Sequence, residues 1–208
     1  RGNERATVDV TGNGFRDRMQ VTALRAGMPQ GRLDASGEIA WSPRLSWTAK
    51  ATLAGFDPGY FAPDWPGAVN GMVLFSGVRR DNGSLLADVE ASNLGGTLRG
   101  RALRGRGTLN IDGDNYAGDV ALGLGDSRID AKGSIAATMQ VDANLAPLHL
   151  DDLLPDGRGV LRGTLKLRGA RNAPDIDIDL AGDGIAFGDY RADRLLAAYQ
   201  AVRPLTAA

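Results

Sequence analysis

Apolar and polar residues alternate along most of this chain. In residues 33–41 and again in 45–53, every second side chain is apolar or glycine, and those between are mostly charged or hydroxylated. The same period of two recurs in residues 120–124, 129–135, 139–145 and 176–180. Such runs, with turn residues about every 8 to 12 positions, predict antiparallel strands that have one apolar face.

The clearest predicted hairpin joins residues 161–169 to residues 175–182. Pairing opposite charges fixes one register: Arg168 with Asp175, Lys166 with Asp177, Thr164 with Asp179, Leu167 with Ile176, and Leu165 with Ile178. Each opposite-charge pair contributes roughly 0.2–1 kcal/mol. A slip by one residue would expose the whole apolar set, so we expect this register to be strongly specified.

The second half of the chain repeats the first at an offset of 92 residues. The matching positions are Gly67, Gly71 and Gly77 with Gly159, Gly163 and Gly169, and Pro63 with Pro155. Residues 33–39 recur as residues 129–135, four positions out of step. A repeated unit stacks on its neighbour to bury its apolar face. We therefore expect internal repeats at approximately 31–110 and 127–202 within one continuous segment, 1–208, and a function that depends on an extended surface.

Three segments depart from this alternation. Residues 57–66 and 147–156 occupy equivalent places in the repeat, are bounded by prolines and carry bulky apolar side chains. We expect each to form a helical turn or loop that caps a sheet edge. Residues 191–202 fit either a helical stripe or strand alternation, and the repeat favours a strand.

Charge and cysteine content exclude several classes of function. The 208 residues contain 24 Lys and Arg against 25 Asp and Glu. Nucleic-acid binding needs a strong basic excess, so we expect no nucleic-acid partner. The lack of cysteine excludes disulfides, metal–thiolate sites and a cysteine nucleophile. No apolar run approaches about 18 residues and no segment resembles a signal peptide, so we interpret the chain as mature or as excised from a longer protein.

Groups suited to catalysis or metal binding are sparse. His149 is the only histidine, and it lies in a proline-bounded connection without a nearby Glu, so we interpret it as an ordinary loop side chain. Asp175, Asp177 and Asp179 could in principle gather calcium. Pairing with Arg162, Lys166 and Arg168 is the interpretation that we favour.

The densest positive patch consists of Arg99, Arg101, Arg104 and Arg106. Arginine can hold a phosphate group through two hydrogen bonds. Glycines are interleaved with these arginines, so we interpret the patch as a polar strand–turn–strand. We expect neither an enzymatic site nor a cofactor or metal.

The order of several loose motifs resembles that of the TamB family, which is allied to the AsmA-like proteins. These motifs are residues 37–43 with the following Trp47, and residues 53–58, 66–71, 98–105 and 153–159. They are spread over most of residues 31–182. The match depends on their order and spacing, because each motif alone is unspecific.

The resemblance implies an all-β fold, an elongated U-shaped trough called a β-taco, built of antiparallel strands in tandem repeats. It also implies a piece of a longer periplasmic protein that is anchored in the inner membrane. The family works with TamA, an outer-membrane barrel, which would be contacted through parts of the chain that are not present here. The family is associated with phospholipid delivery across the periplasm and, in an older view, with assembly of outer-membrane proteins.

We therefore expect a non-enzymatic apolar groove that shields and conducts phospholipid between the two membranes. Its expected lining residues are Leu33, Ala35, Ile39, Trp47, Leu53, Val73, Phe75, Val120, Leu122, Ile129, Met139, Val141, Leu165, Leu167, Ile176, Ile178 and Leu180. Two alternatives remain open at this point. One is a β-rich scaffold that binds strands of outer-membrane proteins by edge pairing, and the other is a filled, purely structural β-solenoid.

Overall fold

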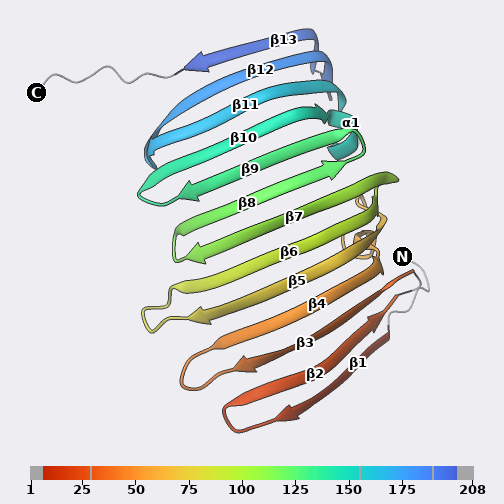
Figure 1. Cartoon of the computed structure of the whole chain (residues 1–208), viewed down its shortest axis with the longest axis vertical. Helices are drawn as coiled ribbons and strands as arrows, with labels where there is room; N and C mark the ends of the chain where they lie inside the picture. The colour runs from red at the N-terminus through yellow and green to blue at the C-terminus, as the bar shows by residue number, and fades with distance from the viewer. Residues whose placement is uncertain (1–6, 29, 155, 189, 201–208) are drawn as a thin grey trace, which may run out of the picture. The chain divides into compact units, whose positions relative to one another are not determined.

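The structure is a computed structural model that describes residues 7–28, 30–154, 156–188 and 190–200. Nearly all of these residues lie in β-strands, as the alternation predicts (Figure 1). The chain divides into two compact units, Arg1–Asp114 and Asn115–Ala208. We call them unit 1 and unit 2.

Unit 1 contains seven of the described strands and one helical turn. Their bounds are β1 Thr7–Gly14, β2 Arg18–Gly27, β3 Arg32–Ala40, β4 Ser46–Phe56, η1 Pro58–Tyr60, β5 Gly67–Arg79, β6 Leu85–Leu98 and β7 Arg101–Asp112. Each strand pairs antiparallel with the next one along the chain.

Unit 2 repeats this organisation among its described residues. Its elements are β8 Asn115–Leu124, β9 Ser127–Ile135, β10 Thr138–His149, α1 Leu150–Leu153, β11 Arg158–Ala170, β12 Ala173–Phe187 and β13 Tyr190–Gln200. Successive strands again pair antiparallel. This all-β, antiparallel architecture, in which strand order follows chain order, agrees with the β-taco expectation.

Two local predictions in unit 2 are confirmed. β11 and β12 pair in the register that the charges predict, with Arg168 opposite Asp175 and Lys166 opposite Asp177. The ambiguous C-terminal segment forms strand β13 as far as Gln200, and residues 201 and 202 lie outside the described part.

The two segments that interrupt the alternation contain short helical turns, as expected. η1 follows β4 and α1 follows β10, so each turn precedes the third-last described strand of its unit. Asp57 caps η1, because its carboxylate accepts the backbone N–H groups of Gly59 and Gly67 at 2.9 and 2.8 Å. Pro155, the repeat counterpart of Pro63, lies outside the described residues.

A buried carboxylate holds α1 against the β8–β9 turn. Asp152 is 1% exposed and accepts hydrogen bonds from the Ser127 hydroxyl at 2.6 Å and the Ser127 backbone N–H at 3.2 Å. The Ser127 hydroxyl oxygen in turn accepts the N–H of His149 at 2.9 Å. His149 is the last residue of β10, and its side chain is half-buried at the point where α1 begins.

Replacing Asp152 with alanine is expected to lower the free energy of unfolding by about 1–3 kcal/mol, because the N–H and hydroxyl of Ser127 would lose a buried acceptor. Urea denaturation of the purified chain measures this change. Asp156→Ala, which removes an exposed carboxylate from the same connection, is the control. Equal losses in the two variants would contradict the role given to Asp152.

β-Bulges interrupt the even-numbered strands β2, β4, β6, β10 and β12. In β2, for example, Val21 lies opposite Gly37 and Leu24 lies opposite Ala35, so two residues face the single residue Ser36. The corresponding register shifts in the other four strands lie in their C-terminal parts. An extra residue bends the strand. It also changes, from odd to even or the reverse, the sequence positions whose side chains point to a given face of the sheet. Apolar positions therefore change from odd to even numbers at the bulge, or in β12 from even to odd.

Ion pairs join neighbouring hairpin ends along one rim of unit 1. Arg44, in the β3–β4 loop, donates two hydrogen bonds to Asp81 in the β5–β6 loop, at 2.7 and 2.6 Å. Arg80 pairs with Asp112 at the end of β7. These hydrogen bonds lower the pKa of both carboxyl groups. Both pairs are exposed, so water and salt weaken them.

Candidate functional site: one apolar face in each unit

Cross-strand register places the seven lining residues predicted in unit 1 on one face. Leu33 lies opposite Leu53, and Ile39 opposite Trp47. The remaining three belong to rows that cross the same strands: Ala35–Ala51–Val73 and Ala49–Phe75–Val89. Residues directly opposite in adjacent strands project to the same side of a sheet. The alternation therefore identified one shared face.

The ten lining residues predicted in unit 2 also share one face. One row crosses five strands: Val120, Ala131, Ala143, Leu165 and Ile178. A second row contains Leu122, Ile129, Leu145, Gly163 and Leu180, and a third contains Val141, Leu167 and Ile176. Met139 lies opposite Ile135 at the end of the same face.

These apolar side chains are only partly covered. Ile39, Phe75 and Val120 are 41%, 40% and 43% exposed, and the other predicted lining residues are half-buried. The described apolar residues that are fully buried are others, namely Val69, Ala87, Leu103, Leu124, Leu148 and Leu150. A filled core would bury most of its large side chains at the density of an organic crystal. Within each unit, these faces therefore retain apolar surface that other molecules could cover.

An aromatic cluster lies on strands β4 and β5 of the unit 1 face, toward the end at which β4 begins. Trp47 lies against Gly77, where an added Cβ would stand 2.4 Å from Trp47 Cζ2. The rings of Trp47 and Phe75 have their centroids 5.6 Å apart. The buried Nε1 of Trp47 has no hydrogen-bond partner among the described residues. This N–H donor departs from the purely apolar face that the alternation predicts.

The opposite face of unit 2 carries an alternating row of charges. The row runs through Asp119, Lys132, Asp142, Lys166 and Asp177, one from each of five successive strands. Arg168 lies beside this row and pairs with Asp142 at 2.5 Å, and Arg162 pairs with Asp183 at 3.6 Å. Alternating charges favour the native register and disfavour a slip that would expose the apolar face to water.

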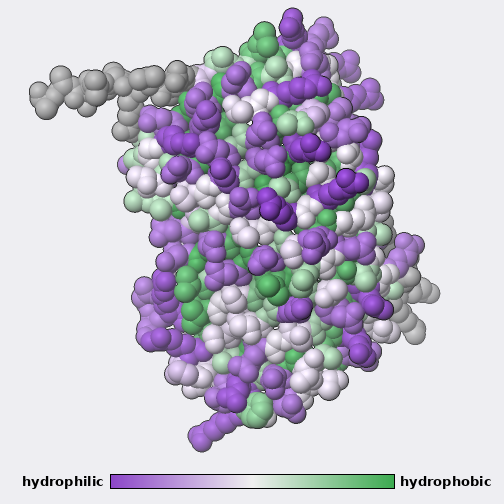
Figure 2. Space-filling model, viewed as in Figure 1, coloured by the Kyte–Doolittle hydropathy of each residue, from purple (hydrophilic) through white to green (hydrophobic). Residues whose placement is uncertain are grey.

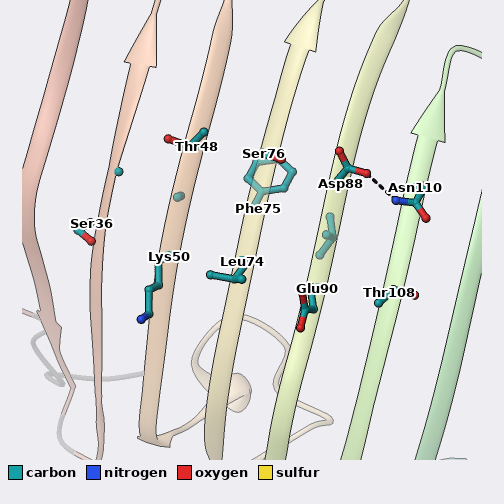
Figure 3. A pocket seen from close by; sticks show the side chains of 13 residues that line it. Ser36, Thr48, Lys50, Leu74, Phe75, Ser76, Asp88, Glu90, Thr108 and Asn110 are labelled. Atoms are coloured by element: carbon teal, nitrogen blue, oxygen red, sulfur yellow. Dashed lines mark hydrogen bonds between the residues drawn. The ribbon is translucent and has the colours of Figure 1, made fainter.

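The polar face of unit 1 contains a recess that the sequence analysis did not predict. Its volume is about 610 Å³, and hydroxyl, amide and charged side chains from β3 to β7 line it (Figure 3). Lys50, Leu74 and Glu90 lie in one cross-strand row, while Asn110 donates a hydrogen bond to Asp88. Figure 2 shows hydrophilic side chains over much of the surface, with apolar side chains among them. No motif marks this recess, because its residues come from five strands.

The remaining candidates are carboxylates that could gather a metal ion and the arginine-rich stretch. Among the described residues there is no group of three His, Cys, Asp or Glu side chains that could hold a metal ion. The arginine-rich stretch is a strand–turn–strand as expected, since Arg99 lies in the β6–β7 turn and Arg101, Arg104 and Arg106 lie on β7. The described part of the chain contains no helix of the length and hydrophobicity needed to span a bilayer.

Comparison with known proteins agrees with this architecture. A family model described as "TamB, N-terminal domain" matches residues 2–204. The translocation and assembly module subunit TamB of Haemophilus influenzae is 22% identical over 180 residues. That match covers 86% of this chain but only 14% of the relative's length. No solved structure matches. Because the family model spans nearly the whole sequence, the chain belongs to the TamB family and corresponds to its N-terminal domain.

Proposed function

We propose that the apolar faces of the two units cover the acyl chains of phospholipids during passage between the inner and outer membranes. The chain would act in the periplasm as part of a protein anchored in the inner membrane, without catalysis. A TamA-like outer-membrane barrel would be the partner of that protein, contacted outside this chain. The observation that carries the proposal is that the predicted lining residues share one face in each unit and none of them is fully buried.

The free-energy cost of moving a lipid through water explains why such a face would be needed. A diacyl lipid carries on the order of 30 CH₂ groups, and each one exposed to water costs roughly 0.8 kcal/mol. Aliphatic side chains remove much of this cost by replacing water around the acyl chains. A face with few polar anchors binds without strong directional preference, which favours release of the lipid.

Photo-crosslinking at adjacent positions tests the proposal. Leu165 and Lys166 are neighbours whose side chains lie on opposite faces of β11, the first on the apolar face and the second in the charged row. A photoreactive residue introduced at position 165 is expected to capture several times more phospholipid than one at position 166. Mass spectrometry of the adducts from cells producing the full-length protein provides the measurement.

The adducts also distinguish the alternative functions. Polypeptide adducts in place of lipid would favour a scaffold for outer-membrane protein strands. Equal lipid capture at both positions, or none at either, would contradict a lipid-covering role for the apolar face. A purely structural solenoid predicts the second of these outcomes, because its core would be closed to lipid.

A further inference from the structure

The connection between β4 and β5 presents aromatic side chains to solvent. Phe61 is 76% exposed and Tyr60 is 38% exposed. The ring of Phe61 stacks on Phe56, with centroids 6.1 Å apart and planes 13° apart, and the ring of Tyr60 meets it edge-on at 5.7 Å. The three rings form one cluster at the end of the strands. In Figure 1 this connection is drawn behind the right-hand ends of the strands.

The equivalent connection in unit 2 shows that a helical turn at this place does not require exposed aromatic residues. There Leu150 is 8% exposed and the carboxylate of Asp152 is buried against Ser127. The unit 2 turn therefore places its main anchoring side chains inward. In unit 1 the anchor is the backbone-bonded Asp57, and Phe61 points outward. Holding the turn in place does not account for an exposed Phe61.

Arginines lie at the same rim. The guanidinium of Arg99 lies over the ring of Trp65, 5.4 Å from its centroid, and the Arg99 N–H donates to the carbonyl of Pro66 at 2.6 Å. Arg101 begins β7, and Arg104 is exposed farther along that strand. The connection itself contains two acids, namely Asp57, whose carboxylate accepts two backbone N–H groups, and the exposed Asp64. The three arginines at this rim thus outnumber the acids of the connection by one.

We propose that Phe56, Tyr60, Phe61, Trp65 and Arg99, the aromatic rim patch, dock on a membrane surface that bears anionic phosphate headgroups. Aromatic rings partition into the headgroup region of a bilayer, and guanidinium groups bind phosphate oxygens there. A stable protein interface uses roughly 20–30 residues on each side, far more than this patch offers. The free energy of partitioning into a bilayer, in contrast, is a sum over individual side chains, so a few of them can be enough.

This inference does not rest on the proposed function, because it concerns the rim of unit 1 and not its apolar face. Docking would hold that end of the strands at the bilayer surface. Acyl-chain binding by Val73 or Leu165 could fail while docking remained, and the reverse could also occur. The experiment therefore measures binding to intact vesicles and not the extraction of lipid.

The test is co-sedimentation of the purified chain with vesicles of phosphatidylglycerol and phosphatidylethanolamine, compared with vesicles of phosphatidylcholine alone. We expect stronger binding to the anionic vesicles. Phe61→Ser is expected to reduce that binding about tenfold, the loss expected for one buried aromatic side chain. Because Phe61 is largely exposed, thermal unfolding of the variant is expected to match that of the wild type.

Phe15 supplies a matched control. It is 46% exposed in the β1–β2 turn, at the opposite rim, and the guanidinium of Arg18 lies 4.6 Å from its ring centroid. Phe15→Ser therefore removes another exposed aromatic residue beside an arginine, and vesicle binding is expected to stay unchanged. Absence of wild-type binding, no loss in Phe61→Ser, or equal losses in both variants would each overturn the proposal.

Discussion

Val73→Asp and Leu165→Asp are expected to abolish binding of a fluorescent acyl-chain probe to the purified chain and to prevent complementation of a strain that lacks the full-length protein. Both side chains lie on apolar faces and are half-buried among neighbouring side chains. A carboxylate surrounded by hydrocarbon costs roughly 2.5–3.5 kcal/mol. Because both positions are only half-buried, most of that cost arises when lipid replaces the remaining water, so the fold is expected to be largely retained.

Leu74→Asp is the control for these substitutions. Leu74 directly follows Val73 but lies on the polar face, 39% exposed and opposite Lys50 and Glu90. The repeat places the charged residue Lys166 at the equivalent position of unit 2. The Leu74→Asp variant is therefore expected to bind the acyl-chain probe and to complement the strain that lacks the full-length protein. If Leu74→Asp abolished binding as fully as Val73→Asp, the apolar face would not be the lipid-binding surface.

Gly163→Val is expected to lower the free energy of unfolding by roughly 3 kcal/mol or more. Gly163 has a φ of +136°, which β-branched residues rarely adopt. An added Cβ would also lie 1.9 Å from the carbonyl oxygen of Asp179 in β12. The clash involves backbone, so relief requires that β11 and β12 move apart. Urea denaturation followed by circular dichroism measures the loss.

Gly14→Ala serves as the control for Gly163→Val. Gly14 ends β1, and an added Cβ there would have no atom within 4 Å other than those of its chain neighbours. Its substitution is expected to change the free energy of unfolding by less than about 1 kcal/mol. A wild-type urea midpoint for Gly163→Val would contradict the close β11–β12 approach at this glycine.

The residue pattern predicted much of the fold because consecutive strands pair with each other. In a hairpin, the side-chain period and the charges of two nearby segments are enough to choose a register. Arg168 therefore falls opposite Asp175, and Leu165 opposite Ile178, as predicted. The same reasoning found the predicted lining residues, since side chains of one parity in successive strands project to one face.

The side-chain ion pairs, the recess and the bulges were not predicted, because they depend on more than the pairing of two neighbouring segments. Arg168 lies opposite Asp175 in backbone register, yet its guanidinium pairs with Asp142 on the other neighbouring strand. The recess over Lys50 and Glu90 gathers residues from five strands, so no local motif marks it. The bulges shift the apolar parity within a strand, as between Val21 and Leu24, and no turn residue at that place marks the extra residue.

The sequence by itself determined which side chains share a face, because the two-residue period leaves only one apolar side for each strand. It also determined that consecutive strands pair, because short turns leave little room for other connections. Only the tertiary structure decided where the strands bend and which turn buries its apolar side chains. Leu150 is buried in one connection and Phe61 is exposed in the equivalent connection, because that difference depends on packing against neighbouring strands.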